Sequence, residues 1–316
     1  MDIKLLASQI LQGERRAIAR GLTLVESSQA HHESLSLELF ECLGRAPRAF
    51  RLGVTGPPGA GKSTLVERLA LSWLKKNDKV AILAIDPSSR KTGGSLLGDK
   101  TRMGAVADHP DVFIRPSPNG AHLGGLGRRT PLMCALLERA GFRRIIVETV
   151  GVGQSEVAAS YHVDKLLLVA LPGAGDEVQG IKRGLMEEVD LVAVNKSDLG
   201  QARATVAVLR SAFRVFRREV PVLAISALEG EGLEALLKEV DLPCGGSERE
   251  RALGEAQFLD QFLLESLKQI LCQPESRWSE LRESVLSGER DLLEVLPLAV
   301  KELNVLRETI FKSSNS

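Results

Sequence analysis

One nine-residue stretch, GPPGAGKST at residues 56–64, constrains this chain more than any other feature. It follows the apolar run 50–54 and precedes a helical pattern that begins at Leu65. The pattern G-x-x-x-x-G-K-S between a strand and a helix is typical of a phosphate-binding loop, because glycines let backbone N–H groups turn towards phosphate oxygens. The positive end of the following helix points at the same anion. We predict nucleotide-binding roles for Gly56, Pro57, Pro58, Gly59, Ala60, Gly61, Lys62, Ser63 and Thr64.

The sequence around this loop predicts the fold class. From residue 49, short β-rich runs alternate with helical stretches, and most of the runs are continuously apolar. Strands with that pattern are buried on both faces of a parallel sheet. The runs are 52–54, 80–85, 112–114, 145–147, 166–170, 191–194 and 222–225. We therefore predict an α/β fold of the P-loop NTPase class, a doubly wound, mostly parallel sheet at 49–240, with N-terminal helices at 1–48 and a C-terminal helical arm at 241–316.

Three carboxylates are candidates for holding Mg²⁺ beside the loop. Asp86 and Glu148 directly follow apolar runs, at the strand ends where ligands bind in open α/β sheets. Asp99 lies in the weakly periodic stretch 90–102, and a loop of that length is usually functional or disordered. The alternatives are a turn cap for Asp86 and solvated charges for Asp99 and Glu148. The predicted magnesium ligands are Ser63, Asp86, Asp99 and Glu148, and the predicted catalytic residues are Lys62, which is placed to reach the β- and γ-phosphates, Asp99 and Glu148.

The tetrapeptide NKSD at residues 195–198 indicates which base the site reads. It follows the predicted strand 191–194, and this placement sets the Asp198 carboxylate against the edge of guanine, which presents two N–H donors. Residues 226–228 end the next predicted strand, where a backbone N–H can bond the guanine carbonyl oxygen. N-K-x-D is also a common surface tetrapeptide, but its place late in a P-loop domain favours GTP over ATP. The predicted base-binding residues are Asn195, Lys196, Asp198, Ser226, Ala227 and Leu228.

Two further Gly-rich segments follow predicted strands. The first, ETVGVGQ, places Gly151 where its backbone N–H can meet the γ-phosphate. Val152 comes next, so a catalytic Gln is missing from that position and Gln154 is a weak substitute. Intrinsic hydrolysis is therefore expected to be slow. The second segment, 171–184, holds four glycines and is either a loop that changes shape or an ordinary connection.

The composition excludes several classes of function. Lys plus Arg and Asp plus Glu both number 41, so the net charge is zero and gives no electrostatic case for nucleic-acid binding. The sequence has no run of 18 apolar residues and no signal-peptide pattern at its start. The four cysteines lie far apart, which argues against a disulfide framework or a structural zinc site. We therefore predict a cytoplasmic protein that binds neither nucleic acid nor a membrane.

Several segments together resemble one family of GTPases. They are GPPGAGKST, DPSSRKTGGSLLGDKTRM, RPSPNGAHLGG, ETVGVGQSE, LPGAGDEVQGIKRG and NKSD, and they lie between Arg51 and Leu228. In this combination the chain resembles the MeaB/MMAA/ArgK GTPases, which are metallochaperones of adenosylcobalamin-dependent methylmalonyl-CoA mutase. The resemblance implies GTP or GDP with Mg²⁺ as cofactors. It implies phosphate and magnesium roles for Lys62, Ser63, Asp86, Asp99 and Glu148, and base reading by Asn195, Lys196 and Asp198.

The same resemblance implies a partner and an assembly. Residues 176–184 would form a switch that transmits the nucleotide state to the mutase, with Asp176, Gln179 and Lys182 as its main residues. The C-terminal arm would form a homodimer, and packing of its apolar stripe, 259–270, on the chain's own nucleotide-binding domain is the alternative. The function implied is that of a slow GTPase that gates adenosylcobalamin loading and protects or reactivates methylmalonyl-CoA mutase.

Two other classes of function stay open at the level of sequence. A nickel-type metal-insertion GTPase needs Cys or His ligands, and the pair His31-His32 is the one feature of that kind. A P-loop small-molecule kinase needs an acceptor pocket and a lid, and the N-K-x-D and Ser-Ala elements weigh against it. Members of the resembling family were long described as transport ATPases for basic amino acids, which the guanine motif and the lack of an apolar span disfavour.

Overall fold

The computed structural model describes most of the chain in separate segments. The described residues are 1–27, 29–86, 103–118, 129–148, 162–173, 183–242 and 277–287, together with 253, 256, 258–260, 264, 289, 294 and 298. The chain divides into two compact units, Met1–Glu255 and Ala256–Ser316. The predicted domain boundaries near residues 48 and 240 stay predictions.

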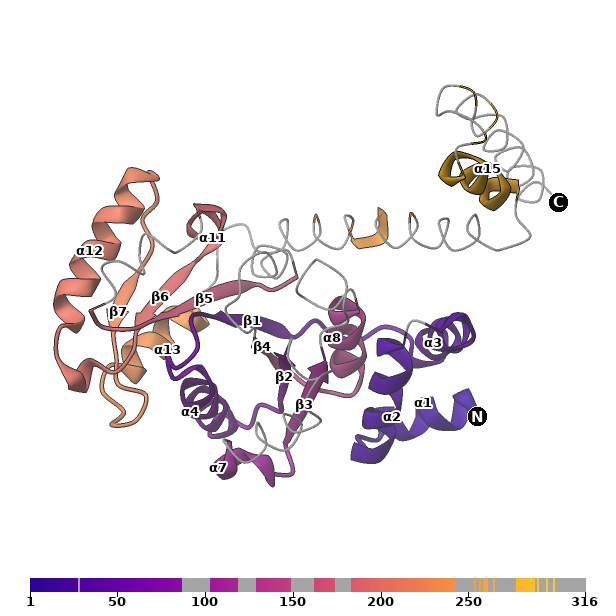
Figure 1. Cartoon of the computed structure of the whole chain (residues 1–316). Coiled ribbons are helices and arrows are strands. Elements are labelled where there is room, and N and C mark those ends of the chain that lie inside the picture. The colour runs from indigo at the N-terminus through magenta and orange to yellow at the C-terminus, as the bar shows by residue number, and fades with distance from the viewer. Residues whose placement is uncertain are drawn as a thin grey trace. The chain divides into compact units, whose positions relative to one another are not determined.

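A seven-stranded sheet runs through the first unit (Figure 1). Its strands are β1 (Phe50–Thr55), β2 (Val80–Asp86), β3 (Val112–Pro118), β4 (Arg144–Glu148), β5 (Lys165–Ala170), β6 (Leu191–Val194) and β7 (Val222–Ala224). Their order is β3-β2-β4-β1-β5-β6-β7, and every neighbouring pair is parallel. Each of the seven predicted runs forms a strand, so the predicted parallel α/β fold is confirmed.

Helices cover both faces of this sheet (Figure 1). The described helices of the first unit are α1 (Ile3–Leu11), α2 (Arg15–Glu26), α3 (Ala30–Leu43), α4 (Lys62–Leu74), α7 (Gly104–Ala107), α8 (Thr130–Arg139), α11 (Arg183–Glu188), the 3-10 helix η1 (Ser197–Leu199), α12 (Ala202–Val215) and α13 (Leu233–Asp241). One core cluster joins α4, α7 and α13 to the sheet, and another joins α8, α11, α12 and the N-terminal helices to it. Along β4, Ile146 belongs to the first cluster, whereas Ile145 and Val147 belong to the second. Burial on both faces explains why the strands read as continuous apolar runs.

The N-terminal helices pack on one another and on α8 through a close approach at Gly21 of α2. A Cβ added at Gly21 would lie 2.8 Å from Cδ1 of Ile10 and 3.0 Å from Cδ1 of Leu136. Ile10 and Leu22 are completely buried. The helices therefore share the core of the sheet's α8 face.

A group of charged side chains holds the end of α13. Asp241 accepts hydrogen bonds from Trp73 Nε1 at 3.2 Å, Lys76 Nζ at 2.6 Å and Arg144 Nη1 at 3.0 Å. Burial raises the pKa of Asp241, but hydrogen bonding to Lys76 and the charge of Arg144 outweigh it, so the pKa lies below its ordinary value. Lys165 Nζ adds a hydrogen bond to the carbonyl oxygen of Leu242 at 2.8 Å. The C-terminal end of α13 is therefore tied to β4, β5 and the end of α4.

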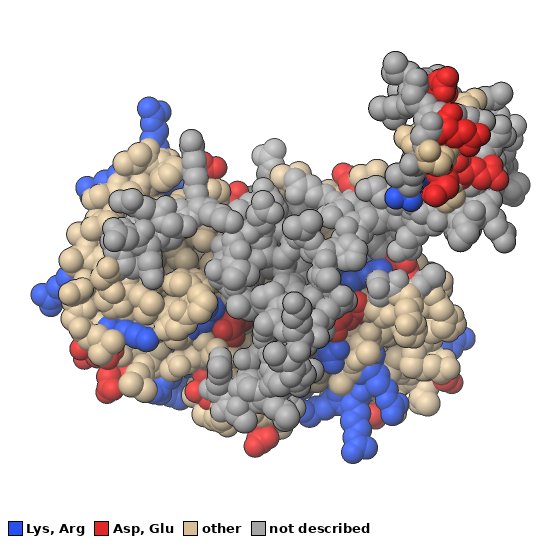
Figure 2. Space-filling view, in the orientation of Figure 1, with Lys and Arg blue, Asp and Glu red and all other residues tan. Residues whose placement is uncertain are grey.

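The second unit is described mainly by α15 (Arg277–Leu286), in which Leu281 and Ser284 are buried. Over the described residues of the chain, no helix combines the length and the apolar character needed to cross a membrane. In Figure 2, basic and acidic side chains both occur over the described part of the first unit, whereas acidic side chains predominate on the described part of the second unit.

Candidate functional site

The loop between β1 and α4 lies so close to other segments of the same chain that two of its positions need glycine. Gly56 has a φ of +144° and Gly61 a φ of +84°. A Cβ at Gly56 would collide with the backbone carbonyl oxygen of Val169 in β5, and a Cβ at Gly61 would collide with the side-chain Nδ2 of Asn195. The loop thus takes the left-handed backbone that the G-x-x-x-x-G-K-S pattern predicts.

Lys62 begins α4 and is buried, with 9% of its surface exposed. Its Nζ donates hydrogen bonds to the carbonyl oxygens of Gly56 at 2.8 Å and Pro57 at 3.0 Å. The N-cap residue of α4 is Gly61, so no side chain caps the backbone N–H groups of the first turn. The ammonium group and the positive end of the helix therefore both lie at the loop, which suits a polyphosphate.

Ser63 and Glu148 supply oxygen atoms beside the loop. Ser63 Oγ donates a hydrogen bond to Glu148 Oε1 at 3.1 Å, and Glu148, at the end of β4, is 8% exposed. β4 pairs with β1 with Val54 opposite Glu148, so the carboxylate lies at the strand end from which the phosphate loop departs. Hydroxyl and carboxylate oxygens are ligands that Mg²⁺ prefers. The two residues therefore fit a magnesium ion, which would neutralise charge on the β- and γ-phosphates when bound.

Asn195 connects the phosphate loop to the segment that is predicted to read the base. It is 2% exposed, and its Nδ2 donates to the carbonyl oxygen of Ala60 at 2.8 Å. Its Oδ1 accepts from the backbone N–H of Ala227 at 2.9 Å. We call these two hydrogen bonds the Asn195 clamp. Sequence reasoning assigned Asn195 to the base, whereas the structure engages both of its polar atoms with the protein backbone.

Asp198 lies in a different environment from Asn195, in the short helix η1. Lys196 has a φ of +60°, and the backbone N–H of Ser197 donates to the carbonyl oxygen of Ile225 at 2.9 Å. This turn ties the residues 195–198 to the end of β7. Asp198 itself is exposed, so its carboxylate is open to a ligand.

The comparison with protein families decides which P-loop proteins this chain resembles. A family model described as "Methylmalonyl Co-A mutase-associated GTPase MeaB" matches residues 18–245. The chain belongs to the MeaB family. A probable GTPase of Mycobacterium tuberculosis is 46% identical over 245 residues, covering 75% of this chain and 73% of the relative. GTPase ArgK of Escherichia coli is 44% identical over 238 residues, covering 72% of each chain.

Two further relatives widen the comparison of this MeaB-family chain. The mouse protein named "Methylmalonic aciduria type A homolog, mitochondrial" is 42% identical over 243 residues, covering 71% of this chain and 59% of the mouse protein. A crystal structure titled "LAO/AO transport system kinase" matches with a TM-score of 0.69 and 29% identity, covering 96% of this chain and 97% of that one. Membership of the family makes the chain a GTPase, in agreement with the names of the bacterial relatives.

Several residues that the sequence assigned to this GTPase site lie outside the described part of the chain. They are Asp99, Gly151, Asp176, Gln179 and Lys182. Asp86 ends β2, beside β4 in the sheet, and its side chain is likewise not described. The structure therefore brings together the phosphate loop, Glu148 and the two segments that are predicted to bind the base, and the roles of all the site residues stay predictions.

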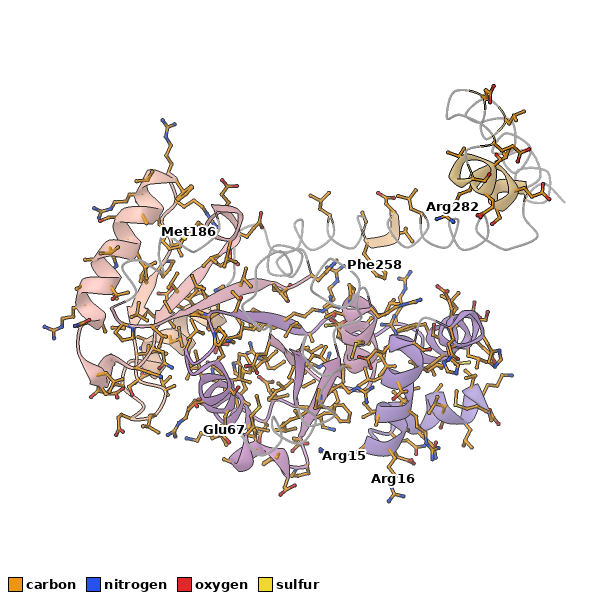
Figure 3. All side chains as sticks on the ribbon, in the orientation of Figure 1. Arg15, Arg16, Glu67, Met186, Phe258 and Arg282 are labelled. Carbon is orange, nitrogen blue, oxygen red and sulfur yellow. The ribbon has the colours of Figure 1, made fainter. Side chains whose placement is uncertain are left out.

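Sequence reasoning missed two side chains of α4 that contact backbone groups far away in the sequence. Glu67 Oε1 accepts a hydrogen bond from the backbone N–H of Ala105 at 2.8 Å and so fixes α7 (Figure 3). Arg68 donates from Nε to the carbonyl oxygen of Ala227 at 3.0 Å and from Nη2 to that of Leu228 at 2.8 Å. The contacts of Arg68 span about half the chain, at 159 and 160 residues of separation, so no local pattern could have indicated them.

Proposed function

We propose that this GTPase is a nucleotide-dependent chaperone of adenosylcobalamin-dependent methylmalonyl-CoA mutase. GTP with Mg²⁺ and GDP define its two states, and the change between them gates cofactor loading and protects or reactivates the mutase. The observation that carries the proposal is the match to the mutase-associated GTPase family over residues 18–245. The name of the mouse relative, which refers to methylmalonic aciduria, supports the same client.

The proposed chemistry assigns one task to each group of residues. Lys62 and the backbone of the phosphate loop bind the β- and γ-phosphates, and Ser63 and Glu148 hold the magnesium ion, with Asp86 and Asp99 as further proposed ligands. Asp198 accepts the two N–H donors of guanine. The residues Asp176, Gln179 and Lys182 form the proposed switch towards the mutase. A nucleotide changes the partner's state only if the partner binds the two nucleotide forms with different affinity.

A binding measurement tests this function. The chain, loaded with either a nonhydrolysable GTP analogue or GDP, is titrated into purified methylmalonyl-CoA mutase by calorimetry. We expect the Kd for the mutase to differ between the two forms by about tenfold, which corresponds to a coupling free energy of about 1.4 kcal/mol. Equal affinity of the two forms, or no association with either, contradicts the proposed switch. Binding of each nucleotide to the chain alone is measured in parallel as the control.

We also propose that the C-terminal arm forms a homodimer. Leu259, Leu264 and Leu298 of the second unit are 55%, 59% and 37% exposed in the single chain. The sequence predicts an apolar stripe over 259–270, and a continuous apolar stripe of this kind is typical of a surface that a partner covers. Light scattering is expected to give twice the chain mass for the full-length protein and the single mass for a chain that ends at residue 245. A full-length monomer contradicts the proposal.

A further inference from the structure

Arg68 lies on α4, six positions after the phosphate-binding Lys62, yet its guanidinium group contacts the base-binding segment. Its Nε donates to the carbonyl oxygen of Ala227 at 3.0 Å, and its Nη2 donates to the carbonyl oxygen of Leu228 at 2.8 Å. The planar fork of a guanidinium group fixes two acceptors at once, and hydrogen bonds from a charged donor are stronger than neutral ones. One side chain therefore orients two consecutive peptide groups of this segment.

The three backbone N–H groups of residues 226–228 differ in whether they have a hydrogen-bond partner within the described part of the chain. The N–H of Ser226 donates to the carbonyl oxygen of Glu231 at 3.0 Å, and the N–H of Ala227 donates to Oδ1 of Asn195 at 2.9 Å. The N–H of Leu228 has no hydrogen-bond partner among the residues that the structure describes, and Leu228 is 66% exposed. Of these three donors, the N–H of Leu228 is thus the one open to a ligand.

Arg68 acts directly on the peptide group that carries this open donor. The carbonyl of Ala227 and the N–H of Leu228 belong to one planar peptide unit, and in a trans unit they point in opposite directions. The hydrogen bond from Arg68 Nε to the Ala227 oxygen therefore fixes the direction of the Leu228 N–H on the other side. It also polarises the peptide unit, which strengthens the hydrogen bond that the N–H donates.

We propose that Arg68 is a positioning residue for base specificity, which holds the Leu228 N–H so that it donates to the carbonyl oxygen at C6 of guanine. The inference rests on the proposed binding of a guanine nucleotide at this site. Adenine carries an amino group at C6, so the same N–H would face a donor and lose its partner. Arg68 thereby adds a second criterion for guanine, independent of the N–H donors that Asp198 would read.

The test compares GDP with 6-thio-GDP, in which sulfur, a weak acceptor, replaces the C6 oxygen and the N–H donors remain. Calorimetry gives the Kd of both nucleotides for the wild type and for Arg68→Met, which keeps a long unbranched side chain and removes the guanidinium group. We expect the variant to bind GDP about five- to tenfold more weakly and 6-thio-GDP less than about twofold more weakly. The preference for GDP therefore falls in the variant.

Two further variants separate positioning from general effects. Arg68→Lys keeps a cation that reaches one carbonyl, so it is expected to retain part of the preference for GDP over 6-thio-GDP. If Arg68→Met does not fold, Arg68→Lys is compared with the wild type in its place. Arg45→Met removes an exposed arginine that has no interaction with any described residue, and it is expected to leave both Kd values unchanged.

Three results overturn the inference while leaving guanine binding intact. They are equal weakening of both nucleotides by Arg68→Met, no change in either, and a wild type that binds GDP and 6-thio-GDP equally well. A wild type that binds no guanine nucleotide overturns the proposed function itself, and this result is visible before any variant is made.

Discussion

Lys62→Ala is expected to lower kcat for GTP hydrolysis by about a thousandfold, because the ammonium group stabilises charge on the transferred phosphoryl group. The structure places this group among backbone carbonyl oxygens of its own loop, 2.8 Å from Gly56 and 3.0 Å from Pro57. We expect phosphate oxygens to take the place of these acceptors when a nucleotide binds. Release of inorganic phosphate from saturating GTP and Mg²⁺ measures the effect.

Lys75 provides a matched control for this substitution. It lies at the opposite end of α4, is exposed, and has no hydrogen bond or ion pair from its side chain to any described residue. Lys75→Ala removes the same side chain from the same helix and is expected to leave kcat within about twofold of the wild type, as is usual for surface substitutions. Wild-type turnover by Lys62→Ala would place the phosphate site elsewhere on the chain.

Asn195→Ala is expected to reduce both stability and nucleotide affinity. Asn195 is 2% exposed, and its removal leaves the carbonyl oxygen of Ala60 and the N–H of Ala227 without their partner. Each such loss costs about 1–3 kcal/mol, so we expect the free energy of unfolding to fall by about 3 kcal/mol. The Kd for GDP is expected to rise by about tenfold or more, because the two halves of the site are no longer held together. Urea unfolding and calorimetry measure the two effects.

Asp198→Ala is the contrasting variant for the Asn195 clamp. Its side chain is exposed, so the free energy of unfolding is expected to change by less than about 0.5 kcal/mol. The preference for GDP over ADP is expected to decrease, because the acceptor for the guanine N–H groups is gone. An Asn195→Ala protein that is as stable as the wild type would show that the clamp does not contribute to folding.

The sheet was predictable because its signal is local. A strand that is buried on both faces leaves a run of apolar residues wherever it occurs, as 166–170 and 191–194 do, and such a run needs no knowledge of its neighbours. The phosphate loop is equally local, since its glycines and Lys62 lie within nine residues. The predicted sheet is therefore confirmed, and the loop takes the backbone conformation that its glycines predict, with positive φ at Gly56 and Gly61.

The extent of β3 was not predictable in the same way. The sequence indicated 112–114, whereas the strand continues to Pro118 through Arg115 and Pro116. Among the described strands β3 is at the edge of the sheet, and an edge strand accepts proline because the missing N–H faces away from its neighbour, β2. The position of β3 in the sheet therefore permits a proline that would disfavour a strand elsewhere, and a sequence pattern does not reveal that position.

The connections within the site depend on partners that are distant in sequence. Asn195 meets residues 135 and 32 positions away, and Arg68 meets Ala227 at a separation of 159. A motif indicates that Asn195 belongs to the site, but only the folded chain shows that it bonds the backbone of two loops. Arg68 belongs to no motif and was therefore not predicted.

The Asn195 clamp has a consequence for how ligand fragments bind. In the proposed function, a single side chain holds the loop assigned to the pyrophosphate at a fixed spacing from the segment assigned to the purine. Once one end of a nucleotide is seated, the other end reaches its own subsite at a high effective concentration and with little added entropic cost. We therefore expect GDP to bind more tightly than guanosine and pyrophosphate offered as separate molecules, because only the covalent link in GDP provides this advantage.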